Sequence, residues 1–92
     1  MAQQVSGQIT VTTAGTEVQG PNIKGARFAL KAHPNNTDTV WIGNDGANAI
    51  AATTGFPLNP GETILRTMRN LNELWFDADI SGEKVCWFIV ES

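Results

Sequence analysis

The stretch LWFDADISGEKVCWFIV, residues 74–90, decides the predicted fold. Apolar residues recur at every second position on both sides of the central Ser81-Gly82 pair, which is the period of a β-strand. A two-residue connection between two such strands favours a β-hairpin. In the register set by that loop, Phe76 lies opposite Trp87 and Trp75 lies opposite Phe88. The stretch therefore predicts two antiparallel strands that are adjacent in one sheet.

The two faces of this predicted hairpin differ in character. One face is apolar throughout, and we expect it to form the core with the apolar face of a second alternating strand at residues 27–33. The predicted core residues are Phe28, Leu30, Leu74, Phe76, Val85, Trp87 and Ile89.

The opposite face of the hairpin carries apolar side chains where solvent-facing residues are expected. We predict that a subunit or capsid contact covers them, because interfaces are enriched in aromatic residues. A second layer of the same chain is the open alternative. The predicted contact consists of Trp75, Phe88 and Val90, with Trp41.

The rest of the chain predicts a series of short strands separated by turns. Strands are expected at residues 8–12, around Val18, and at residues 27–33, 40–42 and 63–68, with a weak one near Ile50. Residues 59–62, Asn-Pro-Gly-Glu, predict a type II turn. Residues 1–7 hold one sizeable apolar side chain and predict a flexible N-terminal arm. The prediction is thus an all-β antiparallel sandwich of seven or eight short strands, with one domain at residues 8–92.

The composition narrows the classes of function. The chain has 92 residues, of which 41% are hydrophobic and 16% charged, enough apolar residues for a single packed core. Six basic against nine acidic residues give a net charge of −3, the wrong sign for binding nucleic acid or an anionic membrane surface. No stretch reaches the roughly 20 apolar residues of a membrane-spanning helix. We therefore expect neither a nucleic acid nor a membrane partner.

Residues with catalytic or ligand-binding chemistry are few. The segment from Asp77 to Gly82 imitates the start of a calcium-binding loop, but Phe88 stands where such a loop needs a glutamate. His33 and Cys86 are each the only residue of their type and have no recognisable catalytic partner. The acidic residues of the last stretch predict a solvated sheet edge. The sequence thus predicts no catalytic, metal or cofactor-binding site, and no enzyme.

Four strings of the sequence resemble a family of small virion proteins of tailed bacteriophages. The most distinctive is Gly-Phe-Pro-Leu-x-Pro-Gly-Glu at residues 55–62, and the resemblance covers nearly all of residues 11–92. The strings are VTTAGTEVQ (residues 11–19), FALKAHPNNTDTVWIGNDG (28–46), TTGFPLNPGETI (53–64) and LNELWFDADISGEKVCWFIVES (71–92).

The resemblance implies a fold and a function. Similar chains occur as head decoration, or cement, proteins and as less well defined virion or tail components, and the fold implied is a β-sandwich of jelly-roll type. The function expected is that of a capsid decoration protein on the outer surface of the virion. It would bind the major capsid protein as a homotrimer and stabilise contacts between capsomers. The alternative is a tail or fibre module that recognises host-surface carbohydrate through exposed Trp and Asn residues.

Overall fold

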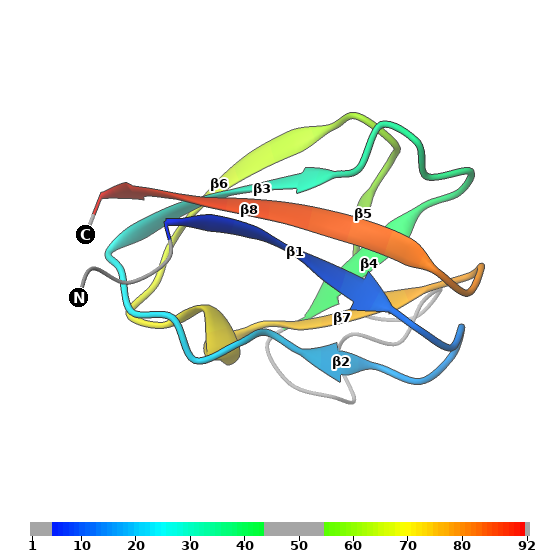
Figure 1. Cartoon of the computed structure of the whole chain (residues 1–92), viewed down its shortest axis with the longest axis horizontal. Helices are drawn as coiled ribbons and strands as arrows, with labels where there is room; N and C mark the ends of the chain where they lie inside the picture. The colour runs from blue at the N-terminus through cyan, green and yellow to red at the C-terminus, as the bar shows by residue number, and fades with distance from the viewer. Residues whose placement is uncertain (1–4, 44–54, 92) are drawn as a thin grey trace.

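The computed structural model describes residues 5–43 and 55–91 as strands joined by turns and one short 3₁₀ helix (Figure 1). In these residues the strand bounds follow the alternating segments of the sequence, since a strand with one buried face needs an apolar residue at every second position. The elements are β1 (Ser6–Val11), β2 (Val18–Gln19), β3 (Arg27–Ala32), β4 (Val40–Gly43), β5 (Phe56–Leu58), β6 (Thr63–Thr67), the 3₁₀ helix η1 (Leu71–Glu73), β7 (Trp75–Ala78) and β8 (Glu83–Glu91).

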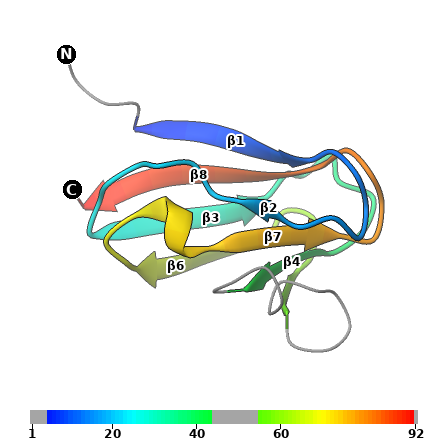
Figure 2. The ribbon, with the colours of Figure 1, turned by 90° about the horizontal axis from the view of Figure 1, so that it is seen from below.

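The strands form two antiparallel sheets of four strands each. Sheet A has the order β1-β8-β3-β6, and sheet B has the order β2-β7-β4-β5. Each strand pairs with the strand equally far from the other end of the chain, so β1 pairs with β8, β2 with β7, β3 with β6 and β4 with β5. In Figure 2 the two sheets overlap, with β2 and β7 of sheet B in front of β3 and β8 of sheet A. The predicted all-β class is confirmed.

The core lies between the two sheets. Strands β3 and β8 of sheet A and β4 and β7 of sheet B each turn alternate apolar residues toward it. All seven residues expected in the core are buried, and Phe28 meets Trp87 edge to face, with ring centroids 6.4 Å apart. The buried cluster also contains Ile9, Val11, Ala32, Val40, Ile42, Leu58, Met68, Leu71 and Ala78.

The predicted hairpin at residues 74–90 is wrong, because β7 and β8 belong to different sheets. Residues 79–82 instead arch across the core from one sheet to the other. The arch is held by the β1–β2 region, since Ala14 N–H donates to Ser81 Oγ (2.9 Å) and Gly82 N–H donates to Val11 O (2.8 Å). The apolar residues of β7 and β8 are therefore buried because they face each other across the core.

The boundary predicted for the N-terminal arm is also wrong. Strand β1 begins at Ser6, which pairs with Phe88, and Gly7 pairs with Trp87. Ile89 N–H donates to Val5 O (2.8 Å), which extends the same ladder. Backbone hydrogen bonds between strands need no apolar side chain. A polar, glycine-containing segment can therefore form a strand although its sequence lacks alternating apolar residues. Residues 1–4 of the predicted arm lie outside the described residues.

The connections agree with the sequence in part. At residues 59–62, Glu62 N–H donates to Asn59 O (2.9 Å) and Gly61 has φ of 85°, so the predicted type II turn is confirmed. The weak strand expected near Ile50 lies outside the described residues. Strand β5 and helix η1 were not predicted. Helix η1 is capped at its start, where the Asn70 side chain accepts from Asn72 N–H (3.0 Å).

Candidate functional site

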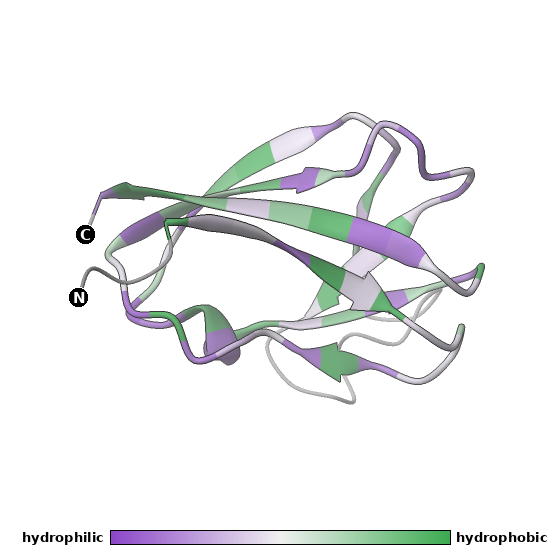
Figure 3. Cartoon of the chain, in the orientation of Figure 1, coloured by the Kyte–Doolittle hydropathy of each residue, from purple (hydrophilic) through white to green (hydrophobic). Residues whose placement is uncertain are grey.

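The outer face of sheet A carries a row of neighbouring apolar side chains, Phe88 of β8, Ala29 of β3 and Leu65 of β6, here called the apolar row. Ala29 is the register partner of both Phe88 and Leu65, so the three lie side by side across the sheet. Phe88 is 52% exposed and Leu65 59% exposed, and Val90 is exposed two residues further along β8. Figure 3 shows hydrophobic segments on both β6 and β8. Large apolar side chains grouped on one exposed face indicate a contact surface.

Polar and charged groups flank the apolar row. On one side Lys31 lies opposite Cys86, which is half-buried and a free thiol. On the other side Arg27 forms an ion pair with Glu91 (3.4 Å). The row is therefore an apolar strip with a polar rim, as in protein contact surfaces. The shallow hollow beside it is lined by Ser6, Gly7, Gln8, Ala29, Lys31, Thr63, Cys86, Trp87 and Phe88.

The edges of the two sheets are protected to different degrees. In sheet B, edge strand β2 has two residues and edge strand β5 has three, one of them Pro57. Short strands and proline are devices that prevent an edge from pairing with another chain. In sheet A, edge strands β1 and β6 have six and five residues and contain no proline. Among the described residues, sheet A thus presents both the exposed apolar row and the longer open edges.

The predicted contact residues divide between the two sheets. Phe88 and Val90 lie on the outer face of sheet A, whereas Trp41 and Trp75 alternate with core residues of sheet B and face outward there. The prediction that Trp75 and Phe88 lie side by side is therefore wrong, since it depended on the hairpin register. Both tryptophans are half-buried. That any of the four residues contacts another protein stays a prediction.

Leu65, the most exposed member of the apolar row, was not predicted as a contact residue. A signal for it was present, because Ile64 and Leu65 are consecutive apolar residues in a strand. Successive side chains of a strand point to opposite faces, so one of the two must face away from the core.

Two carboxylates expected at a solvated edge are buried. Asp77 is 2% exposed, and its Oδ1 accepts from Gly15 N–H (3.0 Å) and Ala78 N–H (2.7 Å). Glu83 is 5% exposed, and its Oε1 accepts from the backbone N–H groups of Thr37 and Asp38, both at 2.9 Å. Each carboxylate thus ties a strand to a neighbouring connection. The expectation of a solvated edge is wrong for these two residues, whose role in this arrangement is structural.

The two residues considered for catalysis lie in the turn after β3 and in the middle of β8. His33 Nδ1 accepts from Asn35 N–H (3.0 Å), which orders the turn after β3. Cys86 lies beside Lys31 and Gln8 on the outer face of sheet A. No group of three or more His, Cys, Asp or Glu side chains within residues 5–43 and 55–91 is arranged to hold a metal ion.

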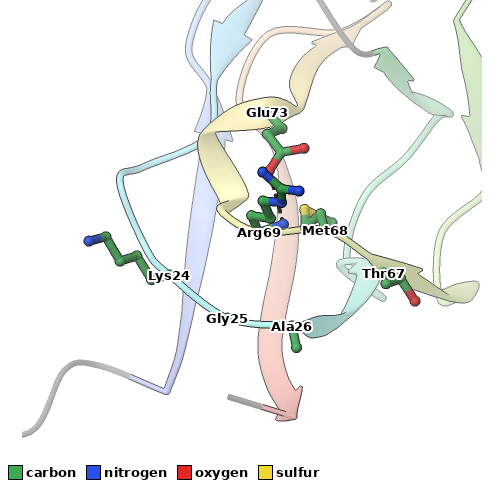
Figure 4. A pocket seen from close by; sticks show the side chains of 7 residues that line it. All are labelled: Lys24, Gly25, Ala26, Thr67, Met68, Arg69 and Glu73. Atoms are coloured by element: carbon green, nitrogen blue, oxygen red, sulfur yellow. Dashed lines mark hydrogen bonds between the residues drawn. The ribbon is translucent and has the colours of Figure 1, made fainter.

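A hollow opens between the segment before β3 and the segment after β6 (Figure 4). Its only carboxylate, Glu73, is already engaged, because Glu73 Oε2 accepts from the N–H groups of Arg69 (2.9 Å) and Asn70 (3.0 Å). The rim of the hollow is therefore basic, and its lining residues do not form a nucleophile paired with a general base. They are Lys24, Gly25, Ala26, Thr67, Met68, Arg69 and Glu73.

Comparison with known proteins finds no matching family model, no matching curated protein and no matching solved structure. In the part of the chain that the structure describes, no helix is long and apolar enough to cross a membrane.

Proposed function

We propose that the protein is a structural component of a bacteriophage virion, a decoration protein that binds assembled heads and stabilises contacts between capsomers. The observation that carries the proposal is the apolar row on sheet A, an exposed apolar surface in a chain whose described residues form no cluster that could hold a metal ion. The resemblance of residues 11–92 to small phage virion proteins gives the class of partner, the major capsid protein on the outer surface of the head.

The strand order supports a jelly roll as the finer description of the fold. In a jelly roll, eight strands in two Greek keys divide between two sheets. Sheet orders β1-β8-β3-β6 and β2-β7-β4-β5 match a long hairpin of paired strands wrapped into two layers. Viral capsid proteins and lectins both use this architecture, so the fold alone does not choose between a capsid partner and a carbohydrate.

The mechanism proposed for a decoration protein depends on surface area and repetition. A sheet face such as the outer face of sheet A can lie against a folded partner without rearrangement of its backbone. Several modest contacts made at once by a homo-oligomer give an avid attachment. The resemblance implies a trimer at local threefold positions of the capsid. A density map of the particle tests this, because it shows how many copies of the protein occupy each such position.

Binding to undecorated capsids tests the proposal, and the chain offers a matched pair of variants. Phe88→Ser removes an aromatic ring from the apolar row, whereas Phe56→Ser removes an equally exposed ring (55%) from sheet B. We expect co-sedimentation with capsids to weaken by at least about tenfold for Phe88→Ser, the loss of a typical aromatic contact. Phe56→Ser is expected to bind like the natural protein.

Two results would count against this proposal. If the natural protein does not co-sediment with undecorated heads, the protein is not a decoration protein. If Phe56→Ser weakens binding as much as Phe88→Ser does, the outer face of sheet A is not the capsid contact. Circular dichroism on both variants checks that each remains folded.

The second candidate function, a tail or fibre module that binds carbohydrate, is favoured by one observation. Trp75 faces outward on β7 and lies opposite Gly43 of β4, which has no side chain to cover it, whereas the neighbouring Trp41 has its indole Nε1 buried. Aromatic faces can stack on sugar rings. Glycan-array binding that is lost in Trp75→Ser and retained in Phe88→Ser would favour this function over capsid decoration.

A further inference from the structure

Strand β6 is an open edge of sheet A. Among residues 5–43 and 55–91, β3 is its one strand partner, with Leu65 opposite Ala29 and Thr63 opposite Lys31. No described residue pairs with its other side. The strand sequence Thr-Ile-Leu-Arg-Thr is rich in β-branched residues, lacks proline and glycine, and carries one charge. These properties favour pairing with a further strand.

The hydrogen bonds at both ends of the β3–β6 ladder establish which backbone groups of β6 face outward. Ala32 N–H donates to Glu62 O (3.0 Å), and Met68 N–H donates to Ala26 O (3.1 Å). Residue pairs that exchange hydrogen bonds alternate with pairs that do not in an antiparallel ladder. The even-numbered residues of β6 therefore bond to β3. The backbone groups of Thr63, Leu65 and Thr67 point to the open edge.

We propose that β6 of one copy pairs antiparallel with β6 of a second copy, about a two-fold axis at Leu65. In this register Leu65 lies opposite Leu65 of the second copy, and Thr63 lies opposite Thr67. All of these residues have outward-facing backbone groups, so the register provides about six intermolecular backbone hydrogen bonds. The two copies of sheet A become one continuous sheet of eight strands.

The side chains of β6 suit pairing with a second copy of itself. Cross-strand Thr–Thr and opposite-charge pairs stabilise antiparallel strands. The two-fold register places Thr63 opposite Thr67, and it places Arg66 diagonal to both Glu62 and Arg66 of the second copy, so an attractive and a like-charge diagonal stand side by side on that face. Glu62 Oε1 accepts from Asn59 N–H (2.7 Å), which leaves the second oxygen of this carboxylate for a contact with Arg66 in the proposed pair. A two-fold contact needs such a self-complementary sequence, because each surface meets its own copy.

The apolar row continues across the proposed contact. Leu65 ends the row at the open edge, so the two-fold axis joins Phe88, Ala29 and Leu65 of one copy to the same residues of the second. Strand β1, the other long edge of sheet A, lacks this property. Its outer-face residues Ser6, Gln8 and Thr10 are polar, and the strand contains Gly7. The observations therefore favour β6 as the self-pairing edge.

Disulfide trapping tests the register directly, in a Cys86→Ser background that removes the natural thiol. Leu65→Cys places two thiols on residues whose Cα atoms are about 5.5 Å apart in the proposed pair, within the range of a disulfide. Thr63→Cys is the matched control on the same strand and face. In the proposed pair, the cysteines at position 63 of the two copies lie four residues apart along the strands, roughly 13 Å. We expect oxidation to convert most of Leu65→Cys into covalent dimer and to leave Thr63→Cys monomeric.

A mixture of Thr63→Cys and Thr67→Cys extends the same test, since these positions oppose each other in the proposed register. The mixture is expected to give a covalent heterodimer that neither variant gives alone. Equal cross-linking of Leu65→Cys and Thr63→Cys would overturn the proposal, because it indicates random collision. Absence of cross-linking in both Leu65→Cys and the mixture would also overturn it.

Sedimentation of the free protein provides a readout without cysteine. Leu65→Pro removes an outward-facing N–H and leaves the bonds to β3 intact, and Gln8→Pro makes the corresponding change at the β1 edge. We expect a dimer in the natural protein and in Gln8→Pro, and a dissociation constant raised by at least about tenfold in Leu65→Pro. A monomer or trimer at about 100 µM natural protein, or dimer loss only in Gln8→Pro, would overturn the proposal. The inference does not depend on the proposed capsid function, but a two-fold dimer is an alternative to the homotrimer that the resemblance implies. The same sedimentation experiment therefore decides between the two assemblies.

Discussion

Replacing Trp87 with alanine is expected to lower the free energy of unfolding by about 3 to 5 kcal/mol, the usual cost of deleting a large buried aromatic side chain. Trp87 is 4% exposed and lies at the centre of sheet A, between β1 and β3. Its ring meets Phe28 edge to face at an interplanar angle of 63°. Alanine removes this contact and leaves a cavity between the sheets. Denaturant titration followed by circular dichroism measures the loss.

The neighbouring residue provides the control for Trp87→Ala. Phe88 follows it on β8 but faces solvent, so Phe88→Ala is expected to cost less than about 1 kcal/mol. A double-mutant cycle of Trp87→Ala and Phe28→Ala should give a coupling of about 0.5 to 1.5 kcal/mol for the aromatic pair. If Phe88→Ala destabilises the protein as much as Trp87→Ala, the two faces of β8 are reversed.

The burial of Trp87 was predictable from the sequence, because it follows from local alternation. Apolar residues stand at alternate positions of β3 and of the part of β8 from Val85 to Ile89, and this alternation indicates which face of each strand is buried. Phe28 and Leu30 were assigned to the core from the same signal, and both are fully buried. Side-chain period is a property of the strand itself, so it needs no knowledge of the neighbouring strands.

The strand partners were not predictable in the same way. The pattern at residues 74–90 is satisfied equally by a hairpin and by two strands that face each other across a core. The two arrangements differ only in which backbone edges pair. The choice depends on distant segments, since β1 and β3 occupy both edges of β8 while β2 and β4 occupy both edges of β7. A short connection is therefore weak evidence for a hairpin when two sheets are present.

The candidate site was predictable only in part for the same reason. Phe88 and Val90 were recognised as apolar residues on the face opposite the core, and both are exposed. Their neighbours come from pairing, which brings Ala29 and Leu65 beside Phe88 from strands far away in the sequence. Which strands form edges is likewise a property of the whole sheet. Local pattern thus identifies candidate residues, and topology assembles them into a surface.

The buried carboxylate of Glu83 shows the same dependence on distant segments. Its Oε1 accepts three hydrogen bonds from one connection, from Thr37 N–H (2.9 Å), Thr37 Oγ1 (3.1 Å) and Asp38 N–H (2.9 Å). The connection between β3 and β4 supplies all three donors, so Glu83 fastens the chain where it passes from sheet A to sheet B. A charged acceptor strengthens each of these bonds relative to a neutral one.

Replacing Glu83 with leucine is therefore expected to lower the free energy of unfolding by about 2 to 4 kcal/mol, because three donors lose their acceptor in a partly buried site. Glu83→Gln keeps an oxygen at the same position and should lose less than about 1.5 kcal/mol. Glu91→Leu, at the exposed end of β8, should change stability by at most about 0.5 kcal/mol. Denaturant titrations give these values, and amide exchange should show faster exchange of Thr37 and Asp38 in Glu83→Leu alone. Unchanged exchange there would mean that Glu83 does not hold the connection between the sheets.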